Sequence, residues 1–113
     1  MTLEELRDQI DVLDRQLVEL LSERARAALR IGHLKAATAL PVYEPGREKV
    51  IYANVRAANK GPLPDIELTH IYERIIDVMR SLQEDQLATE RKAQATAPGH
   101  DTGAPTPETG NKQ

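Results

Sequence analysis

The sequence predicts an all-α protein with three helices, long, short and long, and a disordered C-terminal tail. Apolar residues recur at alternating intervals of three and four from residue 3 to residue 34, which is the heptad pattern of an amphipathic helix. The chain contains no Phe, Trp or Cys, so its core must be built mainly from Leu, Ile, Val and Ala, as in helical bundles. Two prolines at positions 41 and 45 and a Gly-Pro-Leu-Pro run at 61–64 separate this segment from two further amphipathic segments, and Pro and Gly at such positions end helices.

The first predicted helix covers residues 2–38. Thr2 can cap its N-terminus, and Glu4 and Glu5 suit the positive end of the helix dipole. Its apolar seam is interrupted by one arginine: Leu3, Leu6, Ile10, Leu13, Leu17, Leu20, Arg24, Ala27, Ile31 and Leu34. At ~1.5 Å per residue this helix is on the order of 50 Å long, which exceeds the diameter of so small a domain. Its own shorter partners cannot cover the whole seam, so we expect a homodimer.

Two further helices are predicted at residues 45–59 and 65–87. Glu44 followed by Pro45 indicates a helix start, with Glu44 as the cap and proline at the first helical position, where it is favoured. A Gly-Pro-Leu-Pro run separates the two helices, and Asp65 can cap the second of them. The face of this last helix is mostly apolar: Leu68, Ile71, Tyr72, Ile75, Met79, Leu82, and Gln86 or Leu87.

After residue 87 the sequence changes to Ala, Thr, Pro, Gly and charged residues without periodicity, which predicts disorder. We therefore expect one helical domain at residues 1–87 and a disordered tail at residues 88–113. No internal repeat is evident.

The composition argues against several classes of protein. The chain has 15 Lys and Arg residues and 18 Asp and Glu residues, which give a net charge of −3. Nucleic-acid-binding domains, by contrast, are usually basic. Charges interrupt every apolar run well short of a membrane span, and the first ten residues lack the pattern of a signal peptide. The absence of cysteine excludes disulfides and thiolate sites. We expect a cytoplasmic protein with no nucleic-acid or membrane partner.

Arg24 is the residue that points to a function. It occupies a position of the apolar seam, where a guanidinium that cannot lose its proton needs an anionic partner. Arg26, Arg30 and Lys35 follow it with no acidic residue in between, although the protein as a whole is acidic. A solvated basic face or a register-setting polar residue would also produce this pattern. The position of Arg24 favours a small anion bound inside a helical assembly.

Six short motifs occur in order along the chain, and together they are specific. They are Leu6-Arg7 with Leu13-Asp14, Leu20-Leu21 with Arg24, Ile31-Gly32 with Lys35, Pro41-Val42, Arg47-Glu48 and Leu82-Gln83. Over Leu3–Gln86 the chain resembles the all-helical (AroQ-type) chorismate mutases. Residues 81–85 are most similar to the versions of this domain that are attached to the first enzyme of the shikimate pathway.

This resemblance implies an intertwined helical homodimer that converts chorismate to prephenate without a cofactor or metal. It implies that Arg24 and Lys35 bind the carboxylates and the ether oxygen of the substrate, and that Gln83 donates to the same ether oxygen. It also implies that Glu48 accepts a hydrogen bond from the ring hydroxyl and that Arg47 lines the same pocket. A Claisen rearrangement requires a compact, held substrate and donors aimed at the oxygen that gains charge, and these residue types suit that requirement.

Three more residues complete the implied site. The connector around Glu44 closes over the ligand, mainly through its backbone, and Arg7 reaches in from the other subunit. Arg7 lies seventeen residues before Arg24, roughly 25 Å along the helix, so it cannot serve a ligand held by Arg24 and Lys35 of its own chain. Met79 departs from the family pattern, which often has a small or polar residue there, and a hydroxyl contact to a carboxylate is lost.

Other interpretations stay open at this point. Taken singly, Arg7 and Glu48 are typical solvated surface charges, and Lys35 is typical of a cation favoured by the dipole at a helix C-terminus. Gln83 is either a polar core group or a surface residue. An isochorismate pyruvate lyase shares the fold and binds nearly the same dianion, although Glu48 favours the mutase. A regulatory module that binds prephenate or chorismate and acts on a shikimate-pathway synthase is another alternative. A coiled-coil scaffold without turnover is the last.

Overall fold

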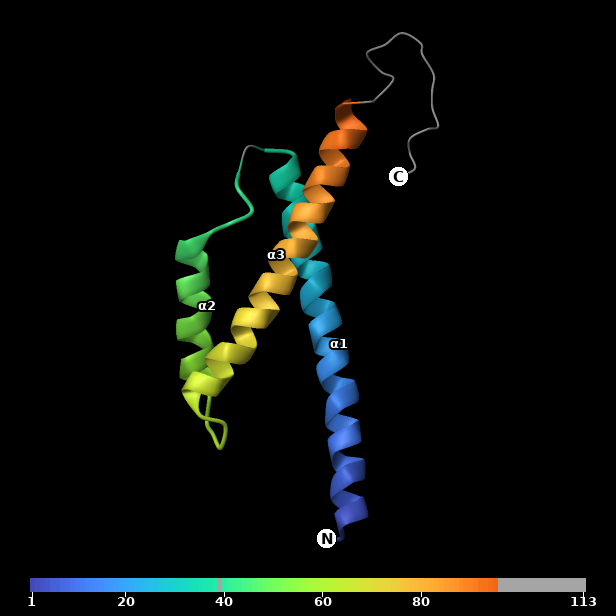
Figure 1. The fold of residues 1–113 in the computed structure, drawn as a ribbon, viewed down its shortest axis with the longest axis vertical. Helices are drawn as coiled ribbons and strands as arrows, with labels where there is room; N and C mark the ends of the chain where they lie inside the picture. Colours follow the sequence, from blue (N-terminus) through green and yellow to red (C-terminus); the bar gives the residue numbers. More distant parts are fainter. Residues whose placement is uncertain (39, 96–113) are drawn as a thin grey trace.

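The computed structural model describes residues 1–38 and 40–95, and they form the three predicted helices (Figure 1). Helix α1 spans Leu3–Ala36, α2 spans Pro45–Ala58 and α3 spans Asp65–Ala95. The described residues contain no strand. The all-α class and the long, short and long order are therefore confirmed. None of these helices is long and apolar enough to cross a membrane.

The N-terminus of α1 is capped as the sequence predicts. The Thr2 hydroxyl accepts a hydrogen bond from the backbone N–H of Glu5 at 3.0 Å, and the Glu5 carboxylate accepts one from the Thr2 backbone N–H at 2.8 Å. This capping box satisfies two N–H groups that have no partner inside the helix. Because these contacts favour the charged carboxylate, the pKa of Glu5 is lowered from its ordinary value.

The start of α2 is partly as predicted. Pro45 occupies the first turn and Glu44 the N-cap position, but the Glu44 side chain makes no capping hydrogen bond. Its carboxylate turns instead to Lys35 on α1. The capping role is therefore wrong for this side chain, because an ammonium group is a stronger partner for a carboxylate than a backbone N–H.

The turn between α2 and α3 also differs from the prediction. Asp65 is the first residue of α3 rather than its cap, and its carboxylate accepts a hydrogen bond from the side-chain amide of Asn59 at 2.7 Å. The Asn59 amide also donates to the backbone carbonyl of Leu63 at 2.7 Å. Gly61 lies in this turn with a φ of 72°, which is the left-handed region that glycine adopts without strain. Two hydrogen bonds from the Asn59 side chain thus hold this turn in place of the expected Asp65 cap.

Helix α3 continues to Ala95 instead of ending at residue 87. Residues 88–95 are mostly good helix formers without Pro or Gly, and the Glu90 carboxylate pairs with the His33 imidazole of α1 at 3.1 Å. The predicted boundary at residue 87 is therefore too early. Residues 96–113, where the rest of the disordered tail is expected, lie outside the described residues.

Helix α3 packs on the C-terminal half of α1 and on α2, whereas the N-terminal half of α1 projects past both (Figure 1). The apolar core is small and consists of Ala28, Ile76, Met79 and Leu87. The Cα radius of gyration is 20.0 Å, compared with roughly 13 Å for a compact domain of about 100 residues. A single chain thus leaves much of its longest helix uncovered.

The projecting half of α1 carries its apolar seam in the open. Within this half every seam residue is exposed, and Leu17, for example, keeps 55% of its accessible surface. Contiguous exposed apolar surface of this kind marks an interaction site in soluble proteins.

Candidate active site

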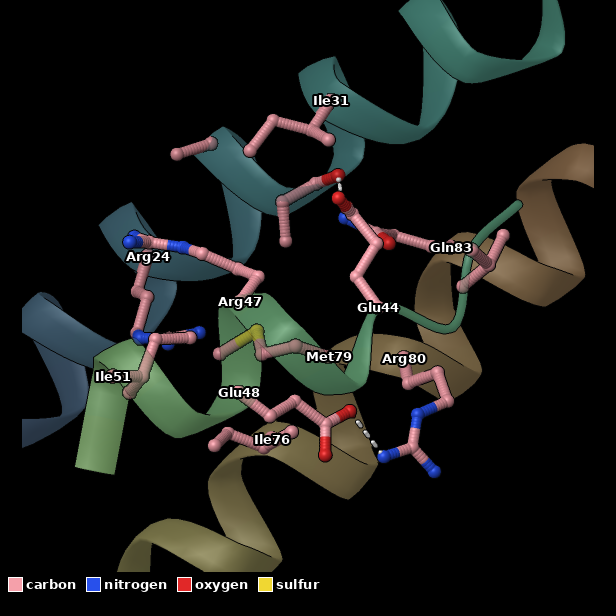
Figure 2. A pocket seen from close by; sticks show the side chains of 13 residues that line it. Arg24, Ile31, Glu44, Arg47, Glu48, Ile51, Ile76, Met79, Arg80 and Gln83 are labelled. Carbon is pink, nitrogen blue, oxygen red and sulfur yellow. Dashed lines mark hydrogen bonds and ion pairs between the residues drawn. The ribbon is translucent and has the colours of Figure 1, made fainter. Parts of the chain in front are cut away.

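The three helices and the connector between α1 and α2 enclose a cavity of about 280 Å³ (Figure 2). That volume is close to the lower end of the roughly 300–1,000 Å³ typical of small-molecule sites. Its walls combine apolar and charged side chains: Arg24, Ala27, Ala28, Ile31, Val42, Glu44, Arg47, Glu48, Ile51, Ile76, Met79, Arg80 and Gln83. Six of the residues predicted from the sequence line it, namely Arg24, Glu44, Arg47, Glu48, Met79 and Gln83.

The helical repeat explains how these residues meet. The lining residues of α3 lie at positions 76, 79, 80 and 83, which share one face of a helix with 3.6 residues per turn. Those of α2 lie at positions 47, 48 and 51, and those of α1 at 24, 27, 28 and 31. Each helix therefore turns one stripe toward the same cavity.

Gln83 lies where α3 crosses α1. Its side-chain amide is buried and donates a hydrogen bond to the backbone carbonyl of Ala28 at 2.8 Å. Gly32 makes this approach possible, because a Cβ atom at that position would lie 3.3 Å from Cγ of Gln83 and 2.5 Å from Oε1 of Gln86. An amide nitrogen carries two N–H groups, so Gln83 keeps a second donor beyond the one held by α1.

Lys35 is buried beside the cavity rather than in its wall. Its side chain is 7% exposed, and Nζ donates to the carboxylate of Glu44 at 2.5 Å and to the backbone carbonyl of Val42 at 3.2 Å. Glu44 and Val42 both line the cavity. Lys35 thus fastens the connector over the end of α1 with two of the three N–H groups that an ammonium carries.

Arg24 and Arg47 supply positive charge from two helices. Figure 2 shows them at one side of the cavity, with Glu44, Arg80 and Gln83 at the other. Arg24 is half-buried, and neither guanidinium forms an ion pair within residues 1–38 and 40–95. Two unpaired guanidinium groups at one cavity offer positive charge and planar N–H donors, which are the groups that suit carboxylates.

Glu48 is the acidic residue that α2 contributes to the cavity wall, and it is paired with an arginine. Its carboxylate accepts a hydrogen bond from Nη2 of Arg80 at 2.6 Å (Figure 2). Arg80 is a lining residue that the sequence prediction missed. The signal was its spacing, because a residue four after Ile76 and three before Gln83 lies on the same helix face.

Residues 6–84 match the family model described as chorismate mutase type II. The chain belongs to this family. The resemblance inferred from the sequence is therefore confirmed for the family and for the all-helical domain. The family match ends close to Gln83, so it includes every residue of the predicted site.

Relatives and solved structures agree with this assignment. The bifunctional chorismate mutase/prephenate dehydratase of Aquifex aeolicus is 41% identical over 85 residues, which cover 72% of this chain and 24% of the relative. The chorismate mutase of Methanocaldococcus jannaschii is 30% identical over 86 residues, which cover 75% of this chain and 87% of the relative. The chain thus spans about a quarter of the bifunctional relative but most of the single-function one.

Two solved structures are similar in both fold and sequence. Chorismate mutase from Thermus thermophilus in its form II superposes with a TM-score of 0.70 at 36% identity, covering 72% of this chain and 92% of the other. Chorismate mutase from Helicobacter pylori in complex with prephenate superposes with a TM-score of 0.69 at 35% identity, covering 76% and 93%.

Met79 and Arg7 differ from the other predicted residues of the chorismate mutase domain, the first in its type and the second in its position. Met79 is buried in the cavity wall, so the departure from a small or polar residue places a thioether beside the ligand space. Arg7 does not lie at the cavity, since it sits on the projecting half of α1 with a side chain 63% exposed, 3.1 Å from the carboxylate of Glu4. One chain therefore brings together all predicted site residues except Arg7.

Proposed function

We propose that this chain is a chorismate mutase that rearranges chorismate to prephenate in aromatic amino-acid biosynthesis. The observation that carries this proposal is the pair of unpaired guanidinium groups, Arg24 and Arg47, at the cavity that Gln83 also lines. Chorismate is a dicarboxylate with an ether oxygen that gains negative charge as its C–O bond breaks. Fixed cations and neutral donors are the groups that stabilise such a transition state.

The side chains have the following roles in this proposal. Arg24 and Arg47 hold the carboxylates and keep the flexible substrate in its compact conformation, which removes much of the entropy barrier. The third N–H of Lys35 and the second amide N–H of Gln83 donate to the ether oxygen. Glu48 accepts a hydrogen bond from the ring hydroxyl. No step requires a nucleophile, a general base or a cofactor.

The proposal includes a homodimer in which Arg7 serves the partner's site. Three features of the chain support it: the exposed seam of α1, the extended shape, and the position of Arg7 far from its own cavity. In an intertwined dimer, the seam of each α1 is covered, and Arg7 of one copy adds a third guanidinium to the carboxylate site of the other. The cavity is then smaller and more enclosed than in one chain.

Two further points belong to this proposal. We infer a cytoplasmic enzyme, as the composition and the absence of cysteine favour. We also infer that a shikimate-pathway synthase is a candidate partner, on the similarity of residues 81–85 to the domains attached to such synthases.

An ultraviolet assay of chorismate consumption with identification of the product tests the function. We expect prephenate to form from chorismate without added metal or cofactor, and no pyruvate to form from isochorismate. Pyruvate release from isochorismate would identify a lyase instead. Binding of prephenate without turnover would favour the regulatory module, which capture of the synthase by the tagged protein would then establish. If the protein neither converted chorismate nor bound prephenate, the coiled-coil scaffold would be the remaining interpretation.

A further inference from the structure

Arg80 is held from three directions at the junction of α2, α3 and the connector. Nη2 donates to Oε2 of Glu48 at 2.6 Å, and Nη1 lies 3.7 Å from Oδ1 of Asp77 one turn earlier on α3. The guanidinium carbon lies 4.9 Å from the centre of the Tyr43 ring, within the range of a cation–π contact. These three partners belong to three different segments of the chain, so they restrict the guanidinium in position as well as in direction.

The pair between Arg80 and Glu48 differs from an ordinary surface ion pair. Exposed pairs contribute little because water solvates both partners, but here the side chains are only 28% and 19% exposed. The hydrogen bond to Glu48 raises the pKa of Arg80 above its ordinary value, so the guanidinium stays charged. Among the residues that the structure describes, Nε of Arg80 is buried and finds no hydrogen-bond partner, which shows that the side chain is inserted into the junction rather than lying on its surface.

This pairing determines the orientation of the Glu48 carboxylate. The terminal torsion of a glutamate is broad and settles into no single staggered position, so an unrestrained carboxylate can present its oxygens in many directions. Arg80 holds Oε2, and no hydrogen bond within the described part of the chain uses Oε1. Because the two oxygens belong to one rigid plane, holding Oε2 also fixes the direction of Oε1 at the cavity.

We propose that Arg80 is a positioning residue for substrate recognition, which holds Glu48 so that one carboxylate oxygen receives the ring hydroxyl of the substrate. The inference rests on the proposed function and extends it to a lining residue that acts through Glu48. The contact with Tyr43 links this arrangement to the connector, so the closed connector and the oriented Glu48 support each other.

A double-mutant cycle tests this role. Arg80→Met keeps much of the side-chain volume but removes the donor, and a misplacement of a binding group by about 1 Å costs up to roughly 100-fold. We expect Arg80→Met to lower kcat/KM for chorismate by about 10-fold to 100-fold, mainly through KM. In the background of Glu48→Ala, Arg80→Met should lower kcat/KM by less than about twofold, because the group that Arg80 positions is gone.

Three comparisons make the test specific. Arg80→Lys keeps a charged donor and should recover part of the loss. Arg74→Met removes an exposed arginine of α3 and should leave kcat/KM unchanged. Affinity for a chorismate analogue without the ring hydroxyl should be the same for the unmodified protein and Arg80→Met, since the proposed effect passes through that hydroxyl. A purely structural defect would weaken both ligands equally.

The outcomes separate this inference from the proposed function. No chorismate turnover by the unmodified protein would overturn both. Normal turnover that Arg80→Met does not change would overturn the inference alone, as would an equal loss with and without Glu48. If Arg80→Met fails to fold, Arg80→Lys and Arg80→Gln carry the same cycle, and additive losses in that cycle would again count against the role.

Discussion

The side-chain amide of Gln83 on α3 donates a hydrogen bond to the backbone carbonyl of Ala28 on α1, at 2.8 Å. This contact joins the two long helices at the wall of the cavity, and it orients the amide that we propose donates to the ether oxygen.

Gln83→Glu should make activity depend on acid. An ionised carboxylate cannot donate to the ether oxygen, whereas the protonated acid can do so through its single O–H. Burial and the facing carbonyl raise the folded-state pKa of the introduced acid above its unfolded value. Its neutral form therefore favours the folded state, and stability is retained below the unfolded pKa and lost as pH rises through the folded pKa. A pH profile of kcat checks this, with Gln83→Leu as the variant that is slow at every pH. A flat profile for Gln83→Glu would remove the donor role.

Gly32→Ala should lower kcat while leaving the unfolding temperature nearly unchanged. Alanine in place of a helical glycine usually stabilises by about 0.5–1 kcal/mol, but here the new Cβ would lie 3.3 Å from Cγ of Gln83. The Gln86 amide can swing aside, whereas Gln83 is held by its bond to Ala28. We expect an unfolding temperature within a few degrees of the unmodified protein and a kcat lower by at least about tenfold. Unchanged kcat would show that the position of Gln83 is not critical.

Lys35→Ala should lower kcat by at least about 100-fold, because it removes a buried charge-assisted donor. The loss of stability should be modest, since the Glu44 side chain left behind is 48% exposed and stays solvated. Lys49→Ala, which removes an exposed lysine of α2, is the control. Steady-state kinetics together with thermal unfolding measure both effects. A near-normal kcat for Lys35→Ala would contradict the proposed mechanism.

Removal of residues 96–113 should leave helicity and turnover unchanged, because the cavity is built within residues 24–83. Removal of residues 88–113 should lower the unfolding temperature, because it also removes the last turns of α3 and the contact of Glu90 with His33. Circular dichroism and the chorismate assay compare the two shortened chains. A large loss of turnover in the first would show that the C-terminal segment contributes to the site.

Local patterns predicted most of the fold because helices follow local rules. The heptad seam, the Thr2 cap and the proline at position 45 located the helices, and α2 ends within a residue of its prediction. The predicted end of the last helix at residue 87 is too early, because residues 88–95 lose the apolar periodicity but contain no Pro or Gly and remain helical. The capping role of Asp65 was wrong because Asn59 competes for the same carboxylate, which no local rule reveals.

The candidate site was predictable where family spacing applied and not where side chains pair across helices. The positions of Arg24, Arg47 and Gln83 at one cavity follow from helix periodicity and the resemblance. The partner of Lys35 depends on the path of the connector, and the pairing of Arg80 with Glu48 depends on the approach of α3 to α2. Both are tertiary contacts between residues that look like ordinary surface charges in the sequence.

The central claim is that the cavity converts chorismate and that a second copy completes it with Arg7. The most direct test mixes two inactive variants, Arg7→Ala and Arg24→Ala, by unfolding and refolding them in equal amounts. Random pairing makes about half of the dimers mixed. One site of each mixed dimer carries both lesions, whereas the other combines an intact Arg24 with an intact Arg7 from across the interface.

We expect each variant alone to be nearly inactive and the refolded mixture to regain roughly a quarter of the unmodified activity per site. Separate refolding of each variant, followed by mixing under conditions where dimers do not exchange, is the control and should show no recovery. If Arg7 served the cavity of its own chain, every site in the mixture would carry a lesion. A refolded mixture as inactive as its parents would therefore contradict the claim.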